Sequence, residues 1–230
     1  MDAQQSGGFV VWLTGMARTG KTTLGAQLAR RFAAVGRRVE FLDGDAPDEL
    51  ITQGLGVSKD DRIAAVRRLG YVARLLARNG AAVVVAHLSP HREARDAVRR
   101  EVRRFVEIFV DCPMETLLHR DADGLYKKAL AGEVKNVAGI DDPYEPPTHP
   151  EVRVLTHQEK VDQATSRVFQ ALVDLKYVGP TEFGRLTGGQ RPRRGQAPGR
   201  GGRGRSRAAA RKAPRKAAAR SARASRKSRR

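Results

Sequence analysis

Short apolar runs alternate with longer segments whose apolar residues recur at helical spacing. Residues 9–13 read FVVWL and residues 81–86 read AAVVVA, and both runs are short and rich in β-branched or aromatic side chains, which is typical of buried parallel strands. Such strands alternating with helices predict an α/β fold, in which helices cover both faces of a five-stranded parallel sheet. The other strands are expected at 39–43, 104–111 and 152–157, and the helices at about 24–35, 61–79, 90–104, 112–120 and 159–175.

The first strand leads into a glycine-rich turn. Residues 15–22 read GMARTGKT, the pattern GxxxxGKT of a phosphate-binding loop, and a helical pattern follows. In such a loop the glycines let backbone N–H groups turn onto phosphate oxygens, the lysine reaches the β and γ phosphates, and the hydroxyl binds Mg²⁺. The sequence predicts a P-loop NTPase-type three-layer α/β/α fold that binds a nucleoside triphosphate. The predicted nucleotide-binding residues are Gly15, Met16, Ala17, Arg18, Thr19, Gly20, Lys21, Thr22 and Thr23, with Lys21 also catalytic and Thr22 a ligand of Mg²⁺.

The second strand ends in FLDGD, with Asp43 and Asp45 at its carboxyl end. Open α/β sheets place their chemistry at this edge, so both acids are candidate catalytic residues that accept a hydroxyl proton, and Asp43 is expected to contact Mg²⁺ through a water molecule. The alternative is a pair of solvated turn residues. We favour the catalytic role because we expect the phosphate loop on the neighbouring strand.

The charge of the chain is unevenly spread. Of the formal +19, residues 187–230 carry 17 Lys or Arg and no acid, which leaves +2 (19 minus 17) on the rest. This composition cannot build a core, so we expect a disordered basic tail. Such a tail can bind nucleic acid phosphates without sequence preference, or it can be a solvated appendage. Residues 1–8 are expected to be a flexible N-terminus.

The cysteine count and the hydropathy of the chain indicate in which cellular compartment the protein is expected. Cys112 is the only cysteine, which excludes an intrachain disulfide and a cysteine-rich zinc site and fits a reducing compartment. The sequence has no start typical of a secretory signal and no apolar run long enough to span a bilayer. We therefore expect a cytoplasmic protein without a membrane partner.

Several further motifs occur together in a fixed order. They are WLTGMARTGKTT, FLDGD, SKDDR, LSPHREARDAVR, FVDCP, RDADGLYKKALAGE and GIDDPYEPP. With them, the chain from about residue 9 to 175 resembles adenylylsulfate kinase. The resemblance implies a kinase domain at 9–178 with a lid at about 120–147, ATP as co-substrate, Mg²⁺ as cofactor and often a homodimer. The implied reaction is transfer of the ATP γ-phosphoryl to the 3′-hydroxyl of adenosine 5′-phosphosulfate (APS), which gives PAPS.

Further site residues follow from matching positions. Ser89 matches a serine that has been labelled a phosphoserine intermediate, and it is a candidate catalytic residue. No activating base is evident beside it, and direct in-line transfer needs no covalent step. The residues expected to bind the acceptor are Arg62, Arg67, Leu88, Ser89, Lys127 and Lys128.

The departures from the family pattern fall on the acceptor pocket. Asp48 stands where the family has an arginine, and Ala65 where it has an asparagine; Val57 and Val137 replace phenylalanines that stack on the adenine of APS. Three interpretations stay open: an APS kinase with a rebuilt pocket, a kinase of the same fold acting on another small hydroxyl compound, and a non-catalytic ATP-binding module tethered to nucleic acid by its tail.

Overall fold

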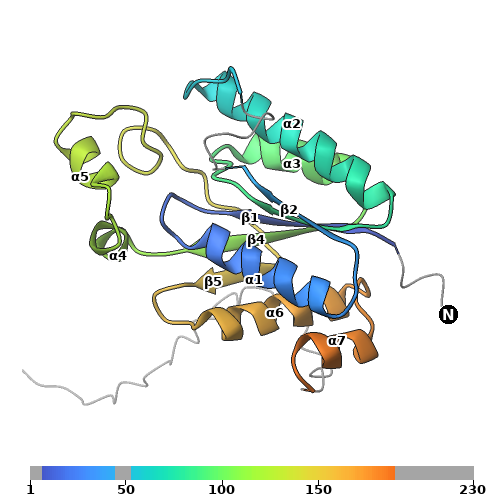
Figure 1. Ribbon diagram of the computed structural model, residues 1–230. Helices are drawn as coiled ribbons and strands as arrows, with labels where there is room; N and C mark the ends of the chain where they lie inside the picture. The colour runs from blue at the N-terminus through green and yellow to red at the C-terminus, as the bar shows by residue number, and fades with distance from the viewer. Residues whose placement is uncertain (1–6, 45–52, 190–230) are drawn as a thin grey trace, which may run out of the picture. The chain divides into compact units, whose positions relative to one another are not determined.

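The computed structural model describes residues 7–44 and 53–189, which form a parallel sheet between two layers of helices (Figure 1). All strand pairings are parallel, and the order is β2-β3-β1-β4-β5. The predicted five-stranded α/β fold is confirmed. The strands are β1 (Phe9–Thr14), β2 (Val39–Asp43), β3 (Ala82–Ala86), β4 (Phe105–Asp111) and β5 (Val152–Leu155).

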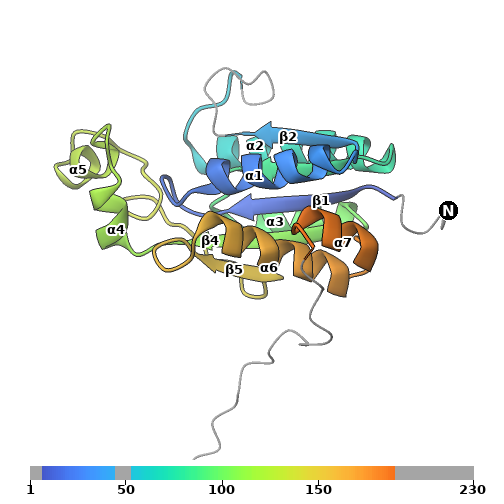
Figure 2. The same ribbon diagram turned by 60° about the horizontal axis from the view of Figure 1, so that its bottom comes forward.

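The helices cover both faces of the sheet and extend beyond one edge. Figures 1 and 2 show α1, α6 and α7 on one face, α2 and α3 on the other, and α4 and α5 beyond the carboxyl ends of the strands. The helices are α1 (Lys21–Ala34), α2 (Lys59–Arg78), α3 (Arg92–Glu101), α4 (Met114–His119), α5 (Leu125–Leu130), α6 (Val161–Asp174) and α7 (Pro180–Leu186).

Alternation along β1 divides the core into two clusters. Phe9, Val11 and Leu13 pack with α1, α6 and α7, whereas Val10 and Trp12 pack with α2 and α3. All of these β1 residues are fully buried, because β1 is central and covered on both faces. The strand that carries the phosphate loop is therefore packed against helices on both faces of the sheet.

The structure differs from the sequence-based expectations in strand order. We expected the strand that ends at Asp43 to neighbour β1, but β3 lies between them. Apolar runs give the number of strands and not their order, because every buried strand presents the same pattern. The expected adjacency is wrong.

Two helices and one terminus also differ. The stretch 121–150, for which we expected neither a helix nor a strand, contains α5. Helix α7 lies beyond residue 178 and buries Phe183 and Leu186 in the α1 and α6 cluster. Gly7, expected in the flexible N-terminus, accepts hydrogen bonds at its carbonyl from Arg37 and Arg104.

Within 7–44 and 53–189, no helix is both long and apolar enough to cross a membrane. The expectation of a disordered tail falls on residues 190–230, which are outside the described part of the chain.

Candidate active site

The strand order places three segments in a row at the carboxyl edge of the sheet. The phosphate loop follows β1, the turn 87–89 follows β3, and Asp43 ends β2. Backbone hydrogen bonds join neighbours in this row: His87 N donates to Leu13 O at 3.1 Å, and Gly44 N donates to Ala86 O at 2.9 Å. The turn therefore lies between the phosphate loop and Asp43, and all three face one site, as open α/β sheets arrange their ligand sites.

The phosphate loop has the geometry that its glycines require. Gly20 has φ of 100°, where other residues are strained, and a Cβ on Gly15 would lie 2.2 Å from the carbonyl oxygen of Val110. Lys21 is 4% exposed, and its Nζ donates to Met16 O at 3.0 Å. Thr22 and Thr23 are exposed in the first turn of α1. A helix start, whose first N–H groups have no partner within the helix, together with a lysine is suited to phosphate.

The lid contacts this loop directly. Tyr126 OH on α5 donates to Ala17 O at 2.8 Å, and Arg18 forms an ion pair with Asp123. Burial raises the pKa of Tyr126 to about 12, so its hydroxyl remains a donor at neutral pH. Asp121 Oδ2 accepts from the backbone N–H of Tyr126 at 2.8 Å and fixes the start of α5.

Asp43 presents an oxygen with no partner. Its Oδ1 is buried and makes no hydrogen bond among the described residues, although a buried carboxylate oxygen is costly when unsatisfied. Such an oxygen is suited to a hydroxyl proton or a metal-bound water, which fits the predicted roles. Asp45, the second predicted acid, lies outside the described residues.

The described residues hold no cluster of three or more acidic, histidine or cysteine side chains that could bind a metal alone. Mg²⁺ in phosphoryl-transfer sites is bound by one or two protein oxygens plus phosphate oxygens and waters. The exposed Thr22 hydroxyl and the partnerless Asp43 Oδ1 therefore fit such an ion.

Ser89 is fully buried, and two side chains flank its hydroxyl. Its Oγ accepts from Trp12 Nε1 at 3.1 Å and lies 2.9 Å from His87 Nδ1. Because His87 Nδ1 also accepts the N–H of Ser89, the ring proton sits on Nε2, and Ser89 Oγ donates to Nδ1. Our expectation that no base lies near this serine is wrong, since His87 does. The hydroxyl of Ser89 nevertheless has both of these hydrogen bonds with side chains inside the protein, one accepted from Trp12 and one donated to His87.

The predicted acceptor-binding residues lie on three different segments: helix α2, helix α5 and the turn 87–89. Arg62 joins α2 to the end of the lid: its Nε lies 3.3 Å from Asp142 Oδ2, and its Nη2 donates to Asn136 O at 2.5 Å. Arg67 is exposed on the same helix. Lys127 and Lys128 are exposed on α5. The other two, Leu88 and Ser89, lie in the central turn.

Comparison with known proteins decides the family. The family model described as adenylylsulphate kinase matches residues 7–155. A relative from Picosynechococcus sp., named adenylyl-sulfate kinase, is 47% identical over 173 residues, which cover 75% of this chain and 98% of the relative. This chain belongs to the adenylylsulfate kinase family.

Other relatives agree. A protein from Pseudomonas aeruginosa named probable adenylyl-sulfate kinase is 44% identical over 71% of this chain and 76% of its own length. The solved structure of the Mycobacterium tuberculosis APS kinase CysC, in complex with AMPPNP and APS, is 35% identical with a TM-score of 0.69, and covers 73% of this chain and 98% of that one. The protein is therefore a kinase with the P-loop kinase fold.

The positions where this adenylylsulfate kinase departs from its family pattern have different surroundings. Val137 is buried in the lid with Cys112, Leu117 and Tyr126, whereas Val57 is 54% exposed. Ala65 is buried in α2, and Asp48 lies outside the described residues. The smaller side chain at 137 thus packs into the lid core.

Two residues of the kinase that the sequence analysis missed close the other side of the phosphate loop. Arg120 donates to Thr156 Oγ1 at 3.0 Å and to Thr156 O at 2.8 Å, and a Cβ on Gly20 would lie 3.8 Å from Thr156 Cγ2. Arg120 belongs to the motif RDADGLYKKA, which was assigned to the lid as a whole, and Thr156 follows β5. The position of Thr156 after a strand, at the edge where ligands bind, is the signal that could have identified it.

A cavity of about 190 Å³ lies between the phosphate loop and the end of the lid. Met16 and Thr19 line it from the loop and Tyr144 and Pro146 from the lid segment, and Phe109 stacks on Tyr144 with ring centroids 6.1 Å apart. Gly139 has φ of 91°, and a Cβ there would lie 2.2 Å from Met16 Sδ. The close approach of the lid segment to the loop thus depends on a glycine.

Proposed function

We propose that this protein transfers the γ-phosphoryl of ATP to the 3′-hydroxyl of APS, which gives ADP and PAPS. One observation carries the proposal. Lys21 in the phosphate loop and Asp43, whose Oδ1 has no hydrogen-bond partner among the described residues, face one site across the turn 87–89, in a chain of the adenylylsulfate kinase family. Phosphoryl transfer depends on positioning and charge neutralisation more than on covalent help.

The bond changes assign a role to each side chain. The 3′-oxygen of the acceptor forms a bond to the γ-phosphorus, and the bond from that phosphorus to the β–γ bridging oxygen breaks. The hydroxyl proton goes to Asp43, whose free oxygen is available for it. Lys21 now donates to a loop carbonyl, and it would exchange that contact for the β and γ phosphates.

Thr22 and, through water, Asp43 would hold Mg²⁺, which neutralises charge on the β and γ phosphates when bound. The lid adds exposed positive charge from Lys127 and Lys128, and its Tyr126 hydroxyl bond to the loop keeps α5 near the nucleotide. We propose that these lysines face the phosphates when the lid covers the site.

The base of ATP would lie beside Arg120 and Thr156. These two residues are joined by two hydrogen bonds next to Gly20, on the side of the loop opposite Asp43. An arginine guanidinium is suited to stack on a flat base. This arrangement leaves the turn 87–89 and Arg62 for the acceptor.

The acceptor pocket favours a second candidate as well, another small hydroxyl compound. The family phenylalanines at 57 and 137 are valines here, one exposed and one buried in the lid core, so neither presents a flat surface to a purine. Loss of stacking weakens base binding by about 1 to 3 kcal/mol per ring. Arg62 can still supply an anion contact if the ligand displaces Asp142 from it.

A steady-state measurement tests the proposal. ADP release by the full chain is followed with Mg-ATP, with and without APS, and Lys21→Ala is the blank. APS-dependent release, at micromolar APS and absent from the blank, supports APS as acceptor. If the chain releases ADP only when another hydroxyl compound is added, the second candidate replaces the first. No acceptor-dependent release at all would leave the non-catalytic ATP-binding module.

We also propose that the segment 187–230 binds nucleic acid without sequence preference. The support is its composition, 17 basic residues and no acid, because phosphate backbones bind such charge through counterion release. The alternative, a solvated appendage, predicts no binding.

A cytoplasmic location and a homodimer complete the proposal. The single cysteine fits a reducing compartment, and light scattering of the purified chain tests for the dimer.

A further inference from the structure

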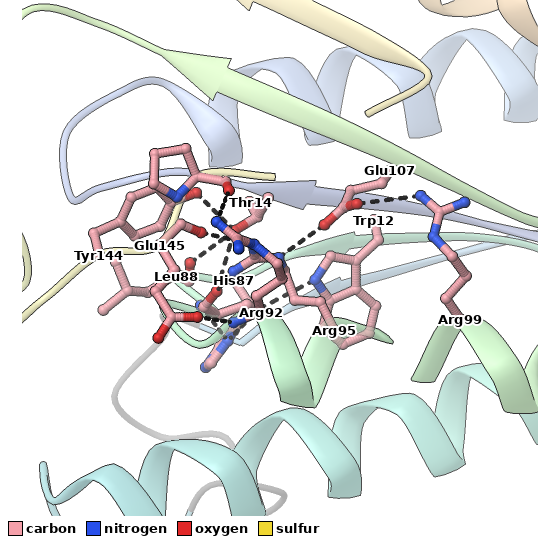
Figure 3. A network of polar contacts seen from close by, with 12 residues as sticks. Trp12, Thr14, His87, Leu88, Arg92, Arg95, Arg99, Glu107, Tyr144 and Glu145 are labelled. Carbon is pink, nitrogen blue, oxygen red and sulfur yellow. Dashed lines mark hydrogen bonds and ion pairs between the residues drawn. The ribbon is translucent and has the colours of Figure 1, made fainter. Parts of the chain in front are cut away.

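A buried arginine lies behind the turn 87–89, and its hydrogen bonds within the described part of the chain go neither to the phosphate loop nor to Asp43. Arg95 is 1% exposed, and it projects from α3 into the network of polar contacts in Figure 3. Its Nε donates to Glu107 Oε1 at 2.8 Å, its Nη1 to Ser89 O at 2.5 Å and its Nη2 to Glu145 O at 2.6 Å. One guanidinium therefore joins β4, the central turn and the end of the lid.

The two segments that Arg95 joins also contact each other. Glu145 N donates to Pro90 O at 2.9 Å, and Arg92 N donates to Glu145 Oε2 at 2.8 Å. Thr14 Oγ1 donates to Leu88 O at 2.9 Å, so its oxygen accepts from Tyr144 OH at 3.0 Å. The turn 87–89, the residue Pro90 that follows it and the segment 144–146 thus form one hydrogen-bonded unit with Arg95 at its centre.

The charge of Arg95 is balanced and its position is fixed from behind. Glu107 also accepts from Arg99 at 3.1 Å, Arg99 pairs with both oxygens of Glu151, and Glu151 accepts the N–H of Glu107 at 2.6 Å. A buried charge is tolerated only with such partners. Each of these hydrogen bonds and ion pairs also restricts the movement of the Arg95 side chain. Arg95 can therefore hold the turn in one geometry.

The turn needs that support because its backbone is unusual. Ser89 has φ of 43°, in a region that residues other than Gly, Asn and Asp seldom adopt. Such conformations persist where the surroundings enforce them. The carbonyl of this same residue accepts the shortest of the three Arg95 bonds.

We propose that Arg95 is a positioning residue for the acceptor. It would fix the turn and the base of the lid as one unit without touching either substrate. Leu88 and Ser89 are the acceptor-side residues of the turn, and Asp142, the partner of Arg62, lies two residues before Tyr144. Arg95 should therefore control acceptor binding and turnover and leave ATP binding nearly unchanged. The inference rests on the proposed function.

The chain offers a matched control on the same helix. Arg99 lies four residues after Arg95 and shares its partner Glu107. Among the described residues, however, it contacts Glu107, Glu151 and the Phe105 ring and not the turn or the lid. Arg95→Lys replaces the two Nη donors, one to Ser89 O and one to Glu145 O, by a single ammonium group and keeps the charge. Arg99→Lys makes the same chemical change away from the turn.

The test measures the KM values for APS and ATP separately, together with kcat, for the full chain. We expect Arg95→Lys to raise the KM for APS by about tenfold or more and to lower kcat, with the KM for ATP within about twofold. Arg99→Lys should change all three by less than about threefold. Tyr144→Phe removes the hydrogen bond to Thr14 Oγ1, which in turn donates to Leu88 O, and so weakens an indirect link between the lid segment and the turn. It should also raise the KM for APS. It is the second variant if Arg95→Lys does not fold.

Trp12 supplies a second readout, since it is the only tryptophan and its Nε1 donates to Ser89 Oγ. APS should change tryptophan emission in the wild type at concentrations near its KM, and Arg95→Lys should shift that titration to higher APS. Equal changes in both KM values, or an Arg95→Lys variant that behaves like Arg99→Lys, would overturn the positioning role while the proposed function stands. A wild type without APS-dependent ADP release would overturn both.

Discussion

Replacing Asp43 by asparagine separates the chemical role of this carboxylate from any role in stability. The amide has nearly the same shape, and Asp43 Oδ1 has no hydrogen-bond partner to lose among the described residues. A buried polar atom without a partner costs about 1 to 3 kcal/mol, so exchange of the charged oxygen for an amide should leave the free energy of unfolding unchanged or raise it slightly.

The effect on catalysis should be large. A positioned general base contributes about 10² to 10⁴ in rate, which corresponds to about 3 to 5 kcal/mol of transition-state stabilisation. We expect Asp43→Asn to lower kcat with APS by a factor in this range. ATP binding should change little, because the phosphate loop, Lys21 and Thr22 are unaltered and the asparagine oxygen can still accept from a Mg²⁺-bound water.

The assay combines three measurements on one preparation: kcat from ADP release, the affinity for ATP from calorimetry, and the melting temperature. The expected pattern is low kcat with wild-type ATP affinity and a melting temperature that is equal or higher. A variant that keeps kcat within about threefold of the wild type would refute the role of Asp43 as base. A large fall in melting temperature would show that the Asp43 carboxylate supports the fold.

Three further predictions concern the loop, the lid and the tail. Gly15→Ala places a Cβ 2.2 Å from Val110 O, so the loop must shift, and calorimetry should show ATP affinity weakened by about tenfold or more. Burial raises the pKa of Tyr126 from about 10 to about 12, so its contribution to stability is complete below pH 10 and is lost as pH rises to 12. Tyr126→Phe should flatten that alkaline decline in urea unfolding, and equal slopes would contradict it. The full chain should bind duplex nucleic acid in fluorescence anisotropy with an affinity that falls steeply from about 50 to 200 mM salt. A chain ending at residue 189 should not bind. Equal binding by both chains would show that the tail is not the binding segment.

The parts of the fold that could be predicted are those with a long or repeated pattern. Buried strands such as 9–13 and 81–86 are recognisable because short apolar runs flanked by turns seldom form any other structure. The phosphate loop is recognisable because each position in it needs one residue type. Helix α5 has only six residues and is fixed by Asp121 from outside, so periodicity could not reveal it. The Gly179-Pro180 pair at the start of α7 was a usable helix-start signal.

The site was predictable in its composition and less so in its contacts. The sequence placed Lys21 in the loop after the first strand and Asp43 at the end of the second, which fixes the edge of the sheet but not the order of the strands along it. It gave no sign that His87 Nδ1 lies 2.9 Å from Ser89 Oγ. Arg95 appeared as one of many charges on a helix, because burial of an arginine depends on partners such as Glu145 that lie 50 residues away.

The most direct test of the account is a single-turnover reaction of the full chain with ATP labelled at the γ-phosphorus and excess APS. Transfer straight to the acceptor predicts that the label appears only at the 3′-position of PAPS and never on the protein, in the wild type and in Ser89→Ala alike, if that variant folds. Label that is found on the wild-type protein before it reaches PAPS, and that is not found on the Ser89→Ala protein, would contradict direct transfer. Label that never reaches APS, while another hydroxyl compound accepts it, would contradict APS as the acceptor.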